Sequence, residues 1–162
     1  MKPTLSHFNQ HGRAQMVDVS NKQETRRVAV AKGSIKISSD LAQILEAGEL
    51  SKGDAFNVAK TAGILGAKKT GDLIPMCHPL GLDQVEVNIE LNKTEQRIYL
   101  TSTARCFGKT GVEMEALTAL SIAALTLYDM CKAVDKQMLI ERIGLASKEG
   151  GKSGSFTNPD FL

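Results

Sequence analysis

The feature that most constrains this fold is one long apolar segment that carries ionisable residues at both ends. Residues 108–134 read GKTGVEMEALTALSIAALTLYDMCKAV, with Glu113 and Glu115 near the start and Asp129 and Lys132 near the end. The segment predicts one long helix, opened by a glycine-flanked Lys-Thr pair. Burying a charged side chain costs on the order of several kcal/mol unless it is paired. We therefore interpret these charges as part of a functional site.

Length and composition indicate a single soluble domain. The chain has 162 residues, of which 42% are hydrophobic and 23% charged, as is usual for globular proteins. No uninterrupted apolar run reaches about 18 residues, so we expect no membrane-spanning helix. Residues 1–15 lack the apolar core of a signal peptide, which favours a cytoplasmic location. The net charge of only +2 and the lack of tryptophan argue against nucleic-acid binding.

The cysteines and histidines show no metal-binding spacing. Cys77, Cys106 and Cys131 form no CxxC pair, and two of the three histidines lie within the first 15 residues. Zinc sites are recognised by closely spaced ligand pairs. We therefore predict no metal site.

Hydrophobic periodicity predicts an α+β fold. Segments of period-two alternation predict strands, and a capped amphipathic pattern predicts helices between them. The expected strands cover residues 26–37 (with Gly33 as a bulge or bend), 83–91, 97–106 and 137–147, and the expected shorter helices cover 39–47 and 53–67. The final order of strand, strand, helix, strand fits a ferredoxin-like antiparallel sheet with helices packed on one face. We expect a flexible leader over 1–15, a single domain over 16–148 and a glycine-rich, partly disordered tail over 149–162.

The start of the long helix has two interpretations. Thr110 and Glu113 have the spacing of a capping box, in which each side chain satisfies a free backbone N–H group. Alternatively, Lys109 and the helix N-terminus attract an anion. Glu113 and Glu115 argue against a bare phosphate there and better suit accepting hydrogen bonds from a purine-like or pterin-like ring edge.

Two near-matches to a phosphate-binding P-loop lack the required context. In the first, Thr103 stands where the pattern before Gly108 needs a glycine or alanine. In the second, residues 146–153 are followed by only nine residues, which include Pro159. The glycine N–H groups of the tail, with Lys148 and Lys152, could still hold phosphate as a flexible clamp.

The end of the long helix offers a pair of ionisable groups. Asp129 and Lys132 are three positions apart, so they share a helix face. A surface ion pair is the simpler interpretation, and such a pair contributes little. The apolar neighbours instead favour a semi-buried proton donor–acceptor pair.

The segment PMCHP at 75–79 predicts a rigid loop, because two prolines fix its backbone. His78 could be a hydrogen-bonded turn residue or a ligand contact. Cys77 is not expected to act as a nucleophile with His78, since neighbouring side chains in an extended backbone point apart. The pattern around Lys52 does not distinguish it from an ordinary solvated lysine.

Six segments occur in an order that resembles a known family. They are MVDVS, SKGD, DLIPMCHPL, GKTGVEMEALTA, YDMCKAV and GGKSG, and they span residues 16–154. On these segments the chain resembles the cyclic pyranopterin monophosphate synthases, the molybdenum cofactor biosynthesis protein C family. The resemblance implies a ferredoxin-like fold assembled as a homohexamer, a trimer of dimers with active sites at the dimer interface. It also implies a lyase that converts 3′,8-cyclo-7,8-dihydro-GTP to cyclic pyranopterin monophosphate and pyrophosphate.

The same resemblance assigns roles to individual residues, all within a single catalytic domain over 16–148. It implies catalysis by Asp129 as general acid with Lys132 and Lys52. It implies substrate contacts from Met76, Cys77, His78, Glu113, Met114, Glu115, Arg27 and Lys148. No cofactor is required, although Mg²⁺ can accompany the triphosphate, and no nucleic acid or membrane partner is expected. Gln15, Met76 and Glu149 depart from residues common in the family, which affects the leader and the tail more than the core chemistry.

Two other classes of function stay open at this point. One is a non-catalytic regulatory module of ferredoxin-like fold that binds purines. The other is a P-loop nucleotide hydrolase. Formation of the pterin product distinguishes the synthase from the first class, and release of pyrophosphate rather than inorganic phosphate distinguishes it from the second.

Overall fold

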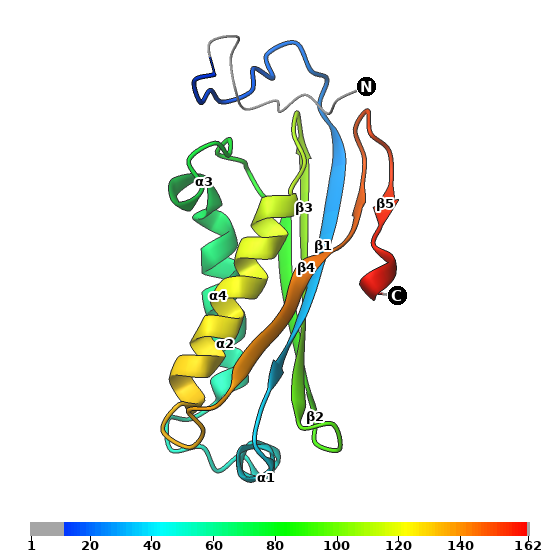
Figure 1. The fold of residues 1–162 in the computed structure, drawn as a ribbon. Coiled ribbons are helices and arrows are strands. Elements are labelled where there is room, and N and C mark those ends of the chain that lie inside the picture. The colour runs from blue at the N-terminus through cyan, green and yellow to red at the C-terminus, as the bar shows by residue number, and fades with distance from the viewer. Residues whose placement is uncertain (1–11, 162) are drawn as a thin grey trace.

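The computed structural model describes residues 12–161 and contains one antiparallel sheet with helices against it (Figure 1). The strands lie in the order β2-β3-β1-β4-β5, and the first four have the order of a ferredoxin-like sheet, as predicted. The strands are β1 (Thr25–Lys36), β2 (Gln84–Asn92), β3 (Arg97–Gly108), β4 (Leu139–Glu149) and β5 (Phe156–Thr157). The helices are α1 (Ser39–Ala47), α2 (Ala55–Lys68), α3 (Thr70–Leu73) and α4 (Glu113–Cys131), with a 3₁₀ turn at Pro159–Phe161.

Helix α4 is the core helix of the fold. By length and composition it could cross a membrane, yet it packs along the sheet beside α2 (Figure 1). Its buried residues are mostly small or apolar, which suits close packing on a sheet; they are Glu115, Ala116, Ala119, Leu120, Ala123, Ala124, Leu127 and Cys131. This packing favours a soluble domain over a membrane span. The helix is shorter than the expected 108–134, because residues 108–112 leave the end of β3 and turn before it begins.

Glycines let α2 approach α4 closely. A methyl group added to Gly63 would lie 2.8 Å from the carbonyl oxygen of Ala119. At Gly66 it would lie 2.8 Å from the side chain of Ile122. Only a residue without a side chain fits these crossing points.

Local signals fixed the boundaries of the first elements. Ser38 caps α1 by accepting a hydrogen bond from the N–H of Leu41, and Gly48 ends the helix in a left-handed conformation. The register of β1 against β4 shifts between Lys32 and Ser34, but the extra residue lies in β4, so the bulge predicted at Gly33 is in the opposite strand. Alternation along β1 places Arg27 on the same side of the sheet as Ala29 and Ala31, facing α4.

The C-terminal segment, for which we expected partial disorder, contains β5 and the 3₁₀ turn. β5 pairs with β4 at Ser147 and Lys148. Lys32 Nζ donates to the carbonyl oxygen of Phe161 at 3.1 Å, and Gly144 leaves room for the Phe161 ring. These contacts hold residues 156–161 against the sheet. Residues 1–11 of the expected leader lie outside the described part of the chain.

Candidate active site

The start of α4 lies at one end of the sheet, next to the loop that follows β4. The predicted capping box is wrong, since Val112 precedes the helix and no side chain caps it. Glu113 instead accepts a hydrogen bond from Lys148 Nζ at 2.9 Å, and its carboxyl group lies over Gly111, where a side chain would clash. The two partners are each 27% exposed. Lys148 of β4 therefore binds the Glu113 carboxyl in place of the backbone N–H group that a capping box would supply.

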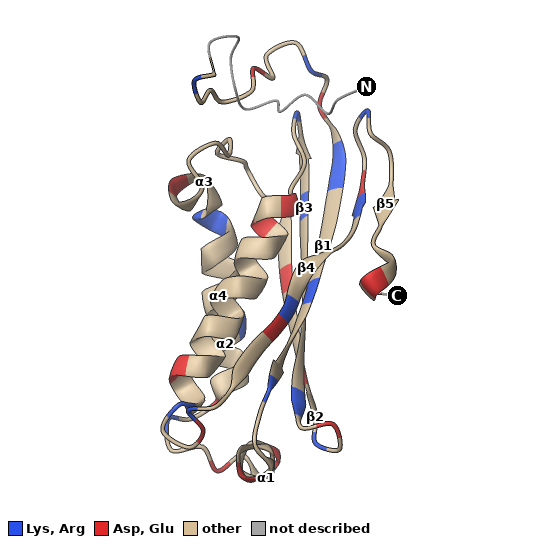
Figure 2. Cartoon of the chain, viewed as in Figure 1, with Lys and Arg blue, Asp and Glu red and all other residues tan. Residues whose placement is uncertain are grey.

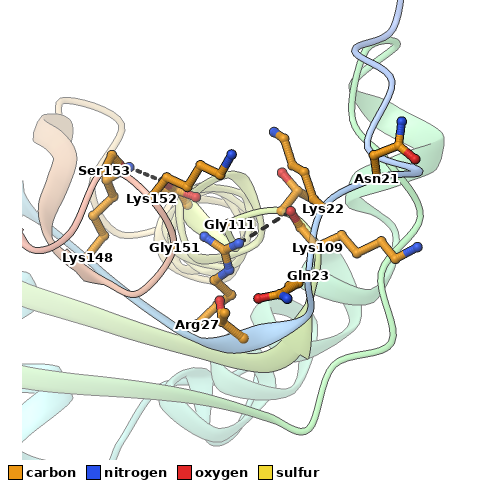
Figure 3. A pocket seen from close by; sticks show the side chains of 13 residues that line it. Asn21, Lys22, Gln23, Arg27, Lys109, Gly111, Lys148, Gly151, Lys152 and Ser153 are labelled. Atoms are coloured by element: carbon orange, nitrogen blue, oxygen red, sulfur yellow. Dashed lines mark hydrogen bonds and ion pairs between the residues drawn. The ribbon is translucent and has the colours of Figure 1, made fainter.

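A cavity of about 780 Å³ opens beside this ion pair (Figure 3). Five Lys and Arg residues line it against a single acid, Glu113, so its walls are strongly positive. Arg27 donates from Nε and Nη2 to the carbonyl oxygens of Gly108 and Lys109, each at 3.3 Å. The lining cations are Lys22, Arg27, Lys109, Lys148 and Lys152. Such a wall suits an anion with several charges, as a polyphosphate has.

The loop after β4 closes one side of this cavity. Gly150 and Gly151 have positive φ angles of 97° and 75°, which other residues rarely adopt. A side chain on Gly151 would collide with the guanidinium of Arg27. Lys148 also donates to Ser153 Oγ at 3.2 Å. The glycines thus let the loop fold back over Arg27 while it places Lys152 in the same cavity as Lys148 of β4.

A second cavity of about 400 Å³ adjoins the first. The two share Lys22, Thr110, Gly111 and Glu113, so Glu113 stands on the wall between them. Met76, Cys77, His78, Met114 and Glu115 complete the smaller cavity, together with Val17, Val19 and Leu80. Its lining is mostly apolar with a few polar groups, which suits a flat ring system.

The loop with the two prolines contributes His78 and Cys77 to the smaller cavity. His78 Nε2 lies 2.8 Å from the carbonyl oxygen of Val17. A carbonyl can only accept, so Nε2 carries a proton and donates it to Val17. This bond ties the segment before β1 to the loop. Burial raises the pKa of the Cys77 thiol, and the charge of Glu115 raises it further.

Glu115 is the most buried acid of the site, with 4% of its surface exposed. Burial raises the pKa of its carboxyl, and the charge of Glu113 acts in the same direction. Its own backbone N–H group at the start of α4 opposes both effects. The surroundings of the two carboxyl groups therefore differ, because Glu113 has a lysine partner and Glu115 is surrounded by apolar and thiol groups.

Besides the two cavities at the start of α4, a cluster of charged residues lies at the opposite end of this helix. Lys132 Nζ is 2.7 Å from Asp129 Oδ1, and Lys52 Nζ donates to the Asp129 carbonyl oxygen at 2.8 Å. The side chains of Asp129 and Lys132 are 61% and 52% exposed, so the expected semi-buried pair is an exposed one in this chain. The loop between α1 and α2 carries Lys52 to this point. In Figure 2 the two charged ends of α4 stand apart, with the uncharged middle of the helix between them.

Proton affinities in this cluster follow from the ion pairs. The hydrogen bond from Lys132, and then the charges of Lys132 and Lys52, lower the pKa of Asp129. The same hydrogen bond raises the pKa of Lys132. Near neutral pH Asp129 is therefore a carboxylate beside Lys132 and Lys52.

The two cavities and the Asp129 cluster contain most of the residues singled out from the sequence. The two cavities collect Arg27, Met76, Cys77, His78, Glu113, Met114, Glu115 and Lys148. Asp129, Lys132 and Lys52 gather about 24 Å away, at 1.5 Å rise per residue along α4. Sequence reasoning missed Lys22, which lines both cavities; nothing in its polar surroundings marks it. Within the described residues, no group of three or more His, Cys, Asp or Glu could hold a metal ion.

Comparisons with known proteins show the family of this chain. The MoaC family model matches residues 16–151. A protein of Clostridium perfringens (strain 13 / Type A) is 51% identical over 156 residues, which cover 96% of this chain and 99% of that relative. A protein of Lysinibacillus sphaericus is 52% identical over 156 residues, or 95% and 98% of the two chains. One of Desulfitobacterium hafniense is 50% identical over 158 residues, or 98% and 96%. All three are named cyclic pyranopterin monophosphate synthase, and this chain belongs to the MoaC family.

Proposed function

We propose that this chain is a cyclic pyranopterin monophosphate synthase, a phosphorus–oxygen lyase of molybdenum cofactor biosynthesis. It converts 3′,8-cyclo-7,8-dihydro-GTP to cyclic pyranopterin monophosphate and releases pyrophosphate. The observation that carries the proposal is the pair of joined cavities around Glu113, one cationic and one mostly apolar. The names of relatives at about half identity over nearly the whole chain support it.

The two cavities fit the two parts of this substrate. Five cations and one carboxylate give the larger cavity an excess of four positive charges (5 − 1), which suits a triphosphate. The smaller cavity offers thioether, thiol and imidazole groups to the ring system. A ligand that occupies both passes Glu113 and competes with it for Lys148, 2.9 Å away.

Pyrophosphate release needs no acid in the larger cavity. A ribose-derived hydroxyl attacks the α-phosphorus, the new O–P bond forms, the bond from the α-phosphorus to the bridging oxygen breaks, and the hydroxyl proton passes to the departing pyrophosphate. Negative charge collects on the departing pyrophosphate, where Arg27, Lys148 and Lys152 stabilise it. Mg²⁺ can accompany the triphosphate as part of the substrate, and no redox cofactor is required because the rearrangement transfers no net electrons.

Ring rearrangement needs several proton transfers, which we assign to Asp129, Lys132 and Lys52. In the resting chain the lysines hold protons and Asp129 accepts one, after which the Asp129 carboxylic acid can act as general acid. A separation of about 24 Å along α4 exceeds the reach of one small substrate. We therefore propose that a second copy supplies this cluster, in a homo-oligomer built as a hexamer from three dimers.

We also assign the protein to the cytoplasm. Cys77, Cys106 and Cys131 are free thiols in the structure, as is usual in a reducing compartment. The substrate is derived from GTP, which is made and held in the same compartment.

The decisive experiment is turnover of purified 3′,8-cyclo-7,8-dihydro-GTP. We expect one pyrophosphate for each pterin product, with both detected chromatographically in the same reaction. Asp129→Asn keeps the side-chain shape and removes the charge, so we expect it to bind substrate and to form no product. Binding without any product in the wild-type protein would favour the regulatory module, and release of inorganic phosphate would favour a hydrolase.

A further inference from the structure

The segment after β5 folds back onto the sheet face opposite the helices. Phe161, at the end of the 3₁₀ turn, lies over Gly144 of β4, where an added methyl group would come within 2.8 Å of its ring. Lys32 of β1 alternates with Ala31, which faces the helices, and its Nζ donates to the Phe161 carbonyl oxygen at 3.1 Å. In Figure 1 this turn lies beside β4, away from the helices. Two strands therefore contact the turn.

A bulge in β4 supplies a further contact to the same turn. Opposite Gly33, β4 has two residues where β1 has one. Arg142, the first of the two, has a φ of 52°, which a residue other than glycine rarely adopts. Its Nη2 donates to the carbonyl oxygen of Asp160 at 2.9 Å, and its guanidinium lies 6.0 Å from the centroid of the Phe161 ring. The bulge therefore directs Arg142 at the turn.

The turn also holds the far end of the loop that closes the larger cavity. This loop, residues 150–155, joins β4 to β5, and the two strands form only two residue pairs. Asn158 extends the pairing, since its N–H donates to the Ala146 carbonyl oxygen at 2.8 Å and its Nδ2 to that of Leu145 at 3.2 Å. Hairpins this short are marginally stable by themselves, and a loop with three glycines loses much conformational entropy when ordered. The contacts of Phe161 add to the few that hold this hairpin.

We propose that Phe161 is a positioning residue for polyphosphate binding, which acts through the hairpin on Lys152 and Ser153. Those two residues line the larger cavity (Figure 3), whereas Phe161 lies outside it. The inference rests on the proposed function and deepens it, since it names a part of the chain that keeps the cavity wall in place before the triphosphate binds. Apparent affinity falls with the fraction of molecules in which the binding conformation is populated. Phe161 therefore sets how often this cavity is complete.

Calorimetric binding of inorganic pyrophosphate to the whole, assembled protein tests this role. Phe161→Ala should raise the dissociation constant by about threefold or more, because the loop then closes the cavity in fewer molecules. Gly144→Ala should act in the same way from the opposite side, since its methyl group displaces the ring. In the double variant the methyl group meets no ring, so the two losses should not add.

Leu139→Ala is the matched control, because it truncates an exposed side chain on the same strand. It should bind pyrophosphate as the wild type does. Unchanged affinity in Phe161→Ala, fully additive losses in the double variant, or no saturable binding to the wild type would overturn the positioning role.

Brief tryptic digestion of the native protein, mapped by mass spectrometry, shows whether the loop is held. Cleavage after Lys152 should be about tenfold faster in Phe161→Ala than in the wild type, because it follows the population in which the loop has opened. Saturating pyrophosphate should slow this cleavage in the wild type. Size-exclusion elution and thermal unfolding should change little, since Phe161 is only half-buried. A lower unfolding temperature with wild-type cleavage and wild-type pyrophosphate binding would make Phe161 merely structural and contradict the proposal.

The two proposals fail in different ways. Pyrophosphate binding that weakens in Phe161→Ala, in a protein that forms no pterin product, would reject the proposed enzyme and leave the role of Phe161. Normal turnover with equal affinities in the wild type and Phe161→Ala would reject that role and leave the enzyme.

Discussion

Two inactive variants of this protein should restore each other when they assemble together. Asp129→Asn disables the end of α4 that carries the proton-transfer cluster. Arg27→Met combined with Lys148→Met removes two cations from the larger cavity at the other end. Because the two ends of α4 lie about 24 Å apart, a site that uses both must combine two chains.

The geometry sets the size of the restored rate. In a random mixture of equal amounts, half of the cavity ends and half of the cluster ends are intact. A site assembled from two different chains is therefore intact in about a quarter of cases (½ × ½), so activity should recover to about a quarter of the wild-type rate. Wild type mixed equally with either variant should give about half, because only one end is then limiting.

Pyrophosphate release from co-expressed variants, purified through two different affinity tags, measures this recovery. Tandem purification enriches mixed assemblies, so the composition is confirmed by mass spectrometry before rates are compared. Size-exclusion elution and thermal unfolding of each variant show whether it still folds and assembles. A mixture no more active than its two components would refute the two-chain site, since one chain would then need to hold both ends.

Three further outcomes follow from the structure. Gly63→Ala should lower the free energy of unfolding by about 1–2 kcal/mol in urea titrations despite its better helix propensity, because the methyl group meets an α4 carbonyl; the exposed Thr61→Ala should change it little. Burial raises the pKa of the Cys131 thiol to about 11, so thiol-specific alkylation mapped by mass spectrometry should reach Cys77 first in the native protein. The lowered pKa of Asp129 means that its stabilising contribution is present above its ordinary pKa of 3.8 and is lost as pH falls through the lowered value. Unfolding curves of wild type and Asp129→Asn should therefore differ at neutral pH and converge in acid.

Local patterns in the sequence predicted the elements well where neighbouring residues decide the outcome. Ser38 and Gly48 bound α1, because helix caps depend on a few adjacent residues. The capping box at Thr110 and Glu113 failed for the opposite reason. Its acid is bound by a lysine 35 positions later in the chain, and local spacing holds no information about that partner.

The residues of the candidate site also fall into two groups, those that local patterns identified and those that only tertiary packing brings to the site. Periodicity and spacing singled out the charges of α4 and the proline-bracketed loop. Lys52 entered only through the family resemblance, because its position beside Asp129 depends on how the α1–α2 loop packs. Lys22 was missed altogether, since the segment before β1 reaches the cavities through contacts such as that of His78 with Val17. Its approach to the site is a tertiary event with no signature in the segment itself.

The ionisable residues of α4 avoid the cost of burying a charge in different ways. Asp129 and Lys132 emerge where the apolar middle of the helix ends, and more than half of each side chain is exposed. Glu113 remains half-buried and has acquired a lysine. Glu115 alone stays in the core without such a partner, because its position in the first turn places it beneath the loop of Cys77. Among residues 12–161 neither exposure nor an ion pair relieves its charge, so burial raises the pKa of its carboxyl, whereas pairing with Lys132 lowers that of Asp129.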